Sequence, residues 1–149
     1  MGFFGNLFGK RQQEPTLSPE QADIVAKALW VLLRSQINAL GHELWAVPTA
    51  NEFVTEKCRG YLFGLSAGVL HAHDLLTVGG HSGRDALDAT FQVVYGPAGR
   101  QLAIASLRDT QRPAFRAASE FAIEEVSQVY AMNHCSTATG FYLYKIGQL

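Results

Sequence analysis

Cysteine is scarce in this sequence of 149 residues, and its placement argues against two kinds of site. Cys58 and Cys135 are the two cysteines, and they form no C-x-x-C unit. The spacing therefore predicts neither a zinc ribbon nor a thioredoxin-type redox pair. A chain of this length buries about 68–70% of the surface that its unfolded form exposes, which is enough for stability without disulfides or metal. We expect both cysteines to be free, buried thiols.

Long apolar runs and clusters of like charge are also missing. The longest apolar stretch, residues 61–70, is shorter than the roughly 20 residues of a membrane-spanning helix. The N-terminus lacks the charged start, apolar run and cleavage site of a secretory signal, so we expect a cytoplasmic protein. The 12 Lys plus Arg and 13 Asp plus Glu give a formal charge of −1. This balance argues against nucleic acid as the main partner, because phosphate neutralisation requires a basic surface.

The first 17 residues differ from the rest and divide into an apolar patch and a polar tether. Large apolar side chains stand at the i, i+1, i+4, i+5 spacing of one helical face, and two basic residues follow them. These residues are Phe3, Phe4, Leu7 and Phe8, followed by Lys10 and Arg11. The patch is rich in glycine and shorter than the about 12 residues that an isolated helix needs, so it should become ordered only on contact. We predict a docking segment over 1–17 and a helical domain over 18–149.

Capping signals place the first helix between Ser18 and Gly41. Ser18 and Gln21 form a capping box, and Pro19 occupies the first helical position, where its missing N–H costs nothing. Gly41 is a natural C-terminal stop. A wide apolar stripe predicts that this helix is buried over most of its circumference. The stripe comprises Ala22, Ala26, Leu29, Trp30, Val31, Leu32, Leu33, Ile37 and Leu40.

Further helices are expected downstream. A capping box at Thr49 and Glu52 predicts a second, long helix over about 50–78, and helices starting at Ser82 and near residue 98 follow it. A last long helix over about 114–146 is either continuous or kinked, and the alternative is a break near Gly140 with residues 141–146 extended. Its expected inner residues are Ile123, Val126, Tyr130, Phe141 and Tyr144. The sequence thus predicts an all-α, single-domain bundle of four to five helices.

Glycine recurs at every fourth position of the second predicted helix, at Gly60, Gly64 and Gly68. Each glycine in a helix interior costs up to ~1 kcal/mol relative to alanine, so the row indicates a compensating gain from close packing or a ligand. We interpret it as a groove into which another helix packs backbone to backbone. The small residues 135–140 are the expected internal complement. The alternatives are a homodimer seam and a ligand groove.

Residues 64–68 also match the G-x-S-x-G pattern of a nucleophile elbow, with histidines and an aspartate close behind. That motif requires a preceding strand in a parallel sheet, whereas the residues before it carry a capping box and helical spacing. We therefore interpret Ser66 as a helical residue that faces solvent, and a serine hydrolase is not expected.

Two weaker patterns indicate candidate ligand sites. His71 continues the glycine face, Asp74 lies one turn further on, and His134 lies on the apolar side of the last helix, a set that suits a metal ion or a general base. A structural histidine bonded to a carboxylate is the alternative. Arg84 and Arg100 follow glycines at helix N-termini, where an anion is favoured and ordinary capping is the alternative. We expect the remaining histidines, His42, His73 and His81, at the surface or in loops.

These observations favour a non-enzymatic interaction or accessory protein that docks through its apolar N-terminal segment to a protein partner or an anionic membrane surface. The alternative is a metal- or small-ligand-binding helical enzyme with a site around His71 and Asp74. No cofactor is expected. A homodimer is a further possible assembly, and the expected location is the cytoplasm or the periphery of a membrane.

Overall fold

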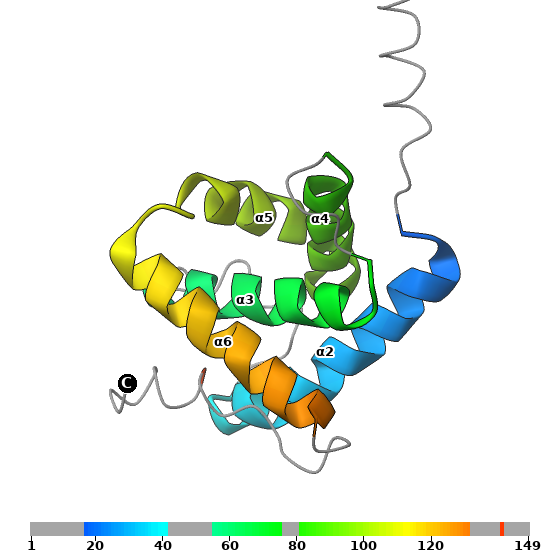
Figure 1. The fold of residues 1–149 in the computed structure, drawn as a ribbon, viewed down its shortest axis with the longest axis horizontal. Helices are drawn as coiled ribbons and strands as arrows, with labels where there is room; N and C mark the ends of the chain where they lie inside the picture. Colours follow the sequence, from blue (N-terminus) through cyan, green and yellow to red (C-terminus); the bar gives the residue numbers. More distant parts are fainter. Residues whose placement is uncertain (1–16, 42–54, 76–80, 132–140, 142–149) are drawn as a thin grey trace, which may run out of the picture.

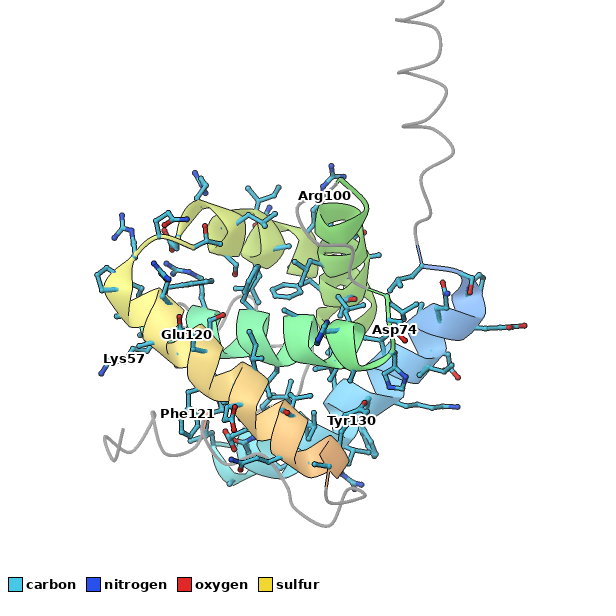
Figure 2. All side chains as sticks on the ribbon, viewed as in Figure 1. Lys57, Asp74, Arg100, Glu120, Phe121 and Tyr130 are labelled. Carbon is cyan, nitrogen blue, oxygen red and sulfur yellow. The ribbon has the colours of Figure 1, made fainter. Side chains whose placement is uncertain are left out.

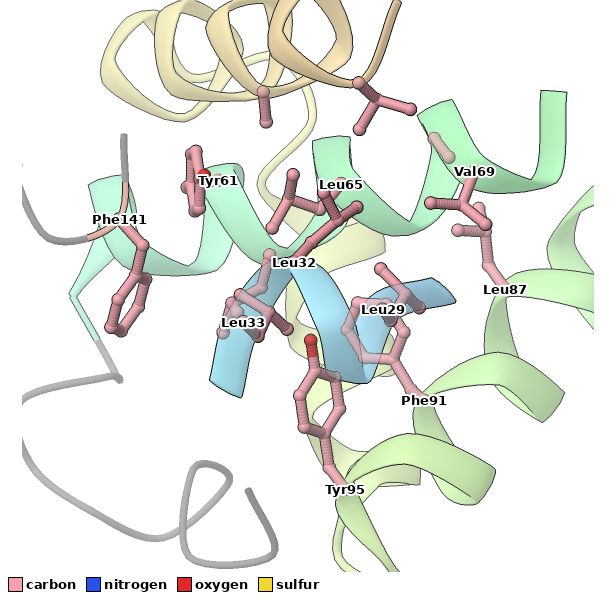
Figure 3. Close-up of a cluster of buried hydrophobic side chains, with 14 of the residues drawn as sticks. Leu29, Leu32, Leu33, Tyr61, Leu65, Val69, Leu87, Phe91, Tyr95 and Phe141 are labelled. Atoms are coloured by element: carbon pink, nitrogen blue, oxygen red, sulfur yellow. The ribbon is translucent and has the colours of Figure 1, made fainter. Parts of the chain in front are cut away.

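The computed structural model describes residues 17–41, 55–75, 81–131 and 141. This part of the chain contains helices and no strand, which confirms the predicted all-α fold. Its helices are α2 (Pro19–Ala39), α3 (Glu56–Ala72), α4 (His81–Tyr95), α5 (Gly99–Arg108) and α6 (Pro113–Ala131). α3 crosses the middle of the molecule (Figure 1). It packs against α6 on one side and against α2 and α4 on the other (Figure 3).

Local capping chemistry sets both ends of α2. The Ser18 hydroxyl accepts a hydrogen bond from the Gln21 N–H at 3.1 Å, and the Gln21 side chain accepts one from the Ser18 N–H at 3.0 Å. Gly41 has φ +80°, the left-handed conformation in which glycine commonly ends a helix. The predicted boundaries of the first helix are therefore confirmed.

α3 is shorter than the predicted second helix. It begins after Thr55, whose extended backbone precedes the helix and whose hydroxyl accepts from the Cys58 N–H at 3.2 Å. It ends at Ala72, and Asp74 has φ +57°, which a right-handed helix cannot contain. The prediction of one helix over about 50–78 is wrong for this reason. The capping box expected at Thr49 and Glu52 lies outside the described residues.

α6 occupies the start of the last predicted helix and is described to Ala131. The expected continuation to residue 146 and the alternative break near Gly140 lie outside the described residues. The predicted inner position of Ile123 is wrong, since this residue is 40% exposed. The inner face of α6 carries mainly small residues, which a search for large apolar side chains overlooks. Its buried residues are Phe115, Ala118, Ser119, Ala122, Val126 and Val129.

The core surrounds α3, whose residues from Cys58 to Leu70 are nearly all buried. Leu29 and Leu33 of α2 and Phe91 of α4 lie on the side of α3 that faces away from α6 (Figure 3). A helix that is buried all round belongs to the interior of a fold rather than to its surface. Cys58 is a buried free thiol, as predicted, and Cys135 lies outside the described residues.

Ser66 shows the consequence of this enclosure. It has no exposed surface, and its hydroxyl donates a hydrogen bond to the Leu62 carbonyl at 3.0 Å. The prediction that Ser66 faces solvent is wrong, because neighbouring helices cover α3 on both sides. A buried hydroxyl bonded within its own helix is also not an exposed nucleophile.

Candidate functional site

α2 carries an uncovered row of apolar side chains, Ile24, Trp30 and Val31, which we call the α2 row. Their exposed fractions are 48%, 46% and 58%. Ile24 and Val31 are two helical turns apart and therefore share one face of the helix. The prediction that this helix is buried over most of its circumference is wrong, because α3 and α4 cover only the opposite face, which carries Val25 and Leu29.

Charged side chains of both signs border the α2 row. Lys27 Nζ lies 2.8 Å from Asp23 Oδ2, and this hydrogen bond, together with the charge of Asp23, raises the pKa of Lys27 above its ordinary value. The Arg34 guanidinium lies 4.5 Å from the centre of the Trp30 ring, a cation–π contact. Tryptophan and arginine are the residue types that dominate binding energy at protein interfaces. The row therefore has the composition of a docking surface.

The predicted docking residues precede this surface in the chain. Phe3, Phe4, Leu7, Phe8, Lys10 and Arg11 all fall in residues 1–16, outside the described part. The described chain starts at Leu17, which packs against the core and directly precedes the cap of α2. The predicted docking segment thus directly precedes, in the sequence, the helix that carries the α2 row.

The glycines of α3 face α6. A methyl group added at Gly60 would lie 2.9 Å from Phe115 Cα, and one added at Gly64 would lie 2.8 Å from Ser119 Cα. Both distances are shorter than atoms tolerate without movement, and the opposing atoms belong to the backbone. The two helices therefore approach each other backbone to backbone at these two positions.

α3 and α6 pack less closely at the third glycine, Gly68. A methyl group at Gly68 would meet the side chain of Val126, with 3.1 Å between the two Cβ atoms. The start of α6 therefore fills the groove, in the place where we expected residues 135–140, which lie outside the described residues. With α6 in this position, the glycine face has no room for a second copy of the chain or for a ligand.

His71 and Asp74 do not share one face of a helix. His71 is exposed in the last turn of α3, whereas Asp74 is exposed beyond the end of the helix (Figure 2). Their predicted placement one turn apart on the helix is wrong, because α3 ends between them. His134 lies outside the described residues. Within the described part of the chain, no group of three or more His, Cys, Asp or Glu side chains is positioned to hold a metal ion.

His73, rather than His71, makes a contact between helices. Its Nε2 atom lies 2.8 Å from the hydroxyl of Tyr130, and the two rings meet edge to face at 5.5 Å. Partial burial raises the pKa of the Tyr130 hydroxyl above its ordinary value. This contact ties the end of α3 to α6. His73 lies in the turn after α3, which agrees with the expectation of a surface or loop residue, and it is half-buried by its contact with Tyr130. Nothing local to His73 in the sequence indicates a partner so far along the chain.

Arg84 and Arg100 lie in different places. Arg84 is in the first turn of α4. Arg100 is exposed at the start of α5 (Figure 2). The side chain of Arg84 lies outside the part of the chain that the structure describes. The residue before α5 is Ala98, which makes no side-chain cap. An anion site at either arginine therefore stays a prediction.

Sequence reasoning missed a polar cluster that joins α3 to the turn between α5 and α6. The Arg59 guanidinium donates to the Asp109 carboxylate, and Arg112 Nε lies 3.3 Å from the same carboxylate. Glu56 Oε1 accepts a hydrogen bond from the Phe115 N–H at 3.2 Å and so caps the first turn of α6. Arg59 stands far from Asp109 in sequence, as Glu56 does from Phe115, so no local pattern reveals these two contacts. The cluster satisfies its own charges and serves packing.

A second missed chain of polar contacts crosses the core. The Gln36 side chain donates to the Tyr61 hydroxyl at 3.3 Å, and that hydroxyl donates to Glu125 at 3.1 Å. Burial, followed by the charge of Glu125, raises the pKa of Tyr61 far above its ordinary value. Tyr61 therefore stays protonated and links α2, α3 and α6 as a hydrogen-bonding residue rather than as a base.

Comparisons with protein-family models, curated proteins and solved structures gave no match to this chain. Within the described residues, none of the helices combines the length and the apolar character that crossing a membrane requires.

Proposed function

We propose that this chain is a non-enzymatic interaction protein that docks to a partner protein through its apolar N-terminal segment, residues 3–8. The exposure of the α2 row is the main observation that supports this proposal. The helix that follows the segment in the chain exposes about half of the side-chain surface of Ile24, Trp30 and Val31. Ile24 and Val31 share one exposed face, and Trp30 lies about 100° around the helix from Val31. Exposed apolar side chains that lie close together are typical of interaction sites. An apolar segment and an apolar surface are therefore neighbours along the chain.

The energetics of the segment support docking. Full burial of a large apolar side chain is worth about 1.5–3 kcal/mol. Immobilising each side chain costs about 0.5–1.5 kcal/mol in return. Burial of Phe3, Phe4, Leu7 and Phe8 therefore contributes about 6–12 kcal/mol against about 2–6 kcal/mol for immobilising these side chains. The difference offsets part of the cost of ordering the backbone and of association, whereas exposure of the side chains to water offsets none of it.

The distribution of charge favours a protein partner over an anionic membrane. A helix that lies on such a membrane carries Lys and Arg on its polar face. The α2 row is bordered by Asp23 as well as by Lys27 and Arg34, so its surroundings carry both signs of charge. Lys10 and Arg11 would each add only about 1 kcal/mol at an anionic surface.

The test compares three forms of the full-length chain: wild type, Phe4→Ser with Phe8→Ser, and the control Ile104→Ser. Ile104 is 47% exposed on α5, so the control removes an exposed apolar side chain elsewhere. We expect the double variant to lose the proteins that the wild type captures from a native cell extract, and the control to retain them. The free energy of unfolding of both variants should stay within about 0.5 kcal/mol of the wild-type value, which is usual for surface changes.

Two results would contradict the proposal. A loss of about 3 kcal/mol or more in the double variant would mean that the segment belongs to the core, as with truncation of buried phenylalanine. Binding to phosphatidylserine-containing vesicles that weakens with salt, without any protein captured, would point to a membrane instead.

A further inference from the structure

We infer that, when no partner is bound, residues 3–8 fold back along α2 and cover the α2 row of the same molecule. A partner must then displace this contact before it can bind the segment. The inference rests on the proposed function, because it describes how the proposed docking segment is held before it docks. The N-terminal segment of the chain itself thus covers the α2 row.

Chain length allows this contact. The segment is joined to Leu17 by residues 9–16, which span at most roughly 26–29 Å when extended. From Leu17 to Val31 the chain rises about 21 Å along the helix axis. The tether therefore reaches the far end of the α2 row without strain. It also brings the segment back along α2 in the antiparallel direction.

The length of the segment and the charges that follow it also fit the surface of α2. Residues 3–8 would rise about 9 Å as a helix, and Ile24 and Val31 are separated by about 10 Å along α2. In the antiparallel arrangement, Lys10 and Arg11 run past the first two turns of α2, where Glu20 is exposed and Asp23 is exposed in its pair with Lys27. Opposite charges are thus placed beside each other while the apolar side chains cover the row.

The covalent connection favours this contact over association with a second molecule. A short tether holds the segment at an effective concentration in the millimolar range, so a contact with a millimolar dissociation constant is formed in about half of the molecules. Association of two chains at micromolar protein concentration has no such advantage. The folded-back form should therefore be independent of protein concentration.

Disulfide cross-linking tests the inference without altering the apolar residues. Asn6→Cys places a thiol within the segment, and Lys27→Cys places one beside the α2 row, where the native side chain is 75% exposed. Cys135 is replaced by Ser in every variant, and the native Cys58 is buried. The matched control pairs Asn6→Cys with Gln101→Cys, an exposed position on α5. Circular dichroism and the melting temperature establish that each full-length variant is folded.

At micromolar protein, we expect the Asn6→Cys, Lys27→Cys pair to form an intramolecular disulfide at least about 10-fold faster than the control pair. Adding Ile24→Ser and Val31→Ser should remove that difference, and Lys10→Glu with Arg11→Glu should reduce it. Equal rates for the two pairs would overturn the inference. Disulfide-linked dimers in place of the intramolecular product would overturn it too, in favour of a second copy of the chain on the α2 row.

The outcome is independent of the capture experiment. Equal cross-linking rates, together with loss of capture in the Phe4→Ser, Phe8→Ser variant, would refute the fold-back and leave the proposed function standing. Rapid cross-linking with capture unaffected by that variant would support the fold-back and refute the proposed function.

Discussion

Replacement of Gly64 by alanine probes the closest contact between α3 and α6. The added methyl group would lie 2.8 Å from Ser119 Cα and 2.9 Å from Ala122 Cβ. The first of these atoms belongs to the backbone, so no side-chain rotation can make room. The helices must move apart along their shared face for the methyl group to fit.

Two opposing effects determine how much Gly64→Ala changes the free energy of unfolding. Alanine is favoured over glycine in a helix interior by up to ~1 kcal/mol. Overpacking a tight interior site costs typically ~1–3 kcal/mol, and a backbone contact belongs at the upper end of that range. We therefore expect Gly64→Ala to lower the free energy of unfolding by about 1–2 kcal/mol. Gly64→Leu should cost more, and far more than Ser66→Ala, which removes a hydroxyl bonded within its own helix.

Urea unfolding followed by circular dichroism measures these differences, with equal slopes required among the variants compared. Gly68→Ala is the matched control, because it brings the same gain in helix propensity on the same face but meets the side chain of Val126 at 3.1 Å. We expect it to be clearly less destabilising than Gly64→Ala. If Gly64→Ala is as stable as the wild type, α3 and α6 do not pack as closely as described, and the reasoning is refuted.

Three further predictions concern polar groups. Asp109→Asn should destabilise the fold by about 1–3 kcal/mol in urea unfolding, because it weakens a largely buried ion pair with Arg59; Asp23→Asn, in an exposed pair, should cause no measurable change. Tyr95→Phe should leave the melting temperature unchanged or raise it, because the buried Tyr95 hydroxyl has no hydrogen bond of normal geometry and the neighbouring Ser66 hydroxyl donates to its own helix. Burial raises the pKa of Tyr95 above its ordinary value of 10.0, so the unfolded chain loses this proton first as the pH rises. The contribution of this residue to the free energy of unfolding should therefore be constant below about pH 10. Above pH 10 it should fall by about 1.4 kcal/mol per pH unit, and Tyr95→Phe should reduce that slope.

Local chemistry allowed the sequence by itself to determine the helical class and several helix ends. The Ser18 capping box and the stop at Gly41 act between residues a few positions apart, so each end can be derived without knowledge of the rest of the fold. The four-residue spacing of the glycines likewise indicated a face for close packing before any neighbouring helix was known.

Tertiary structure alone decided which faces are covered and which residues meet. Ser66 is buried and Trp30 is exposed, although helical periodicity suggested the reverse, because α3 is enclosed on both sides and α2 is covered on one. Periodicity reports that residues share a face, whereas burial depends on which helix packs there. The contact of His73 with Tyr130 has the same origin, since two helices distant in sequence must pack before their side chains can bond.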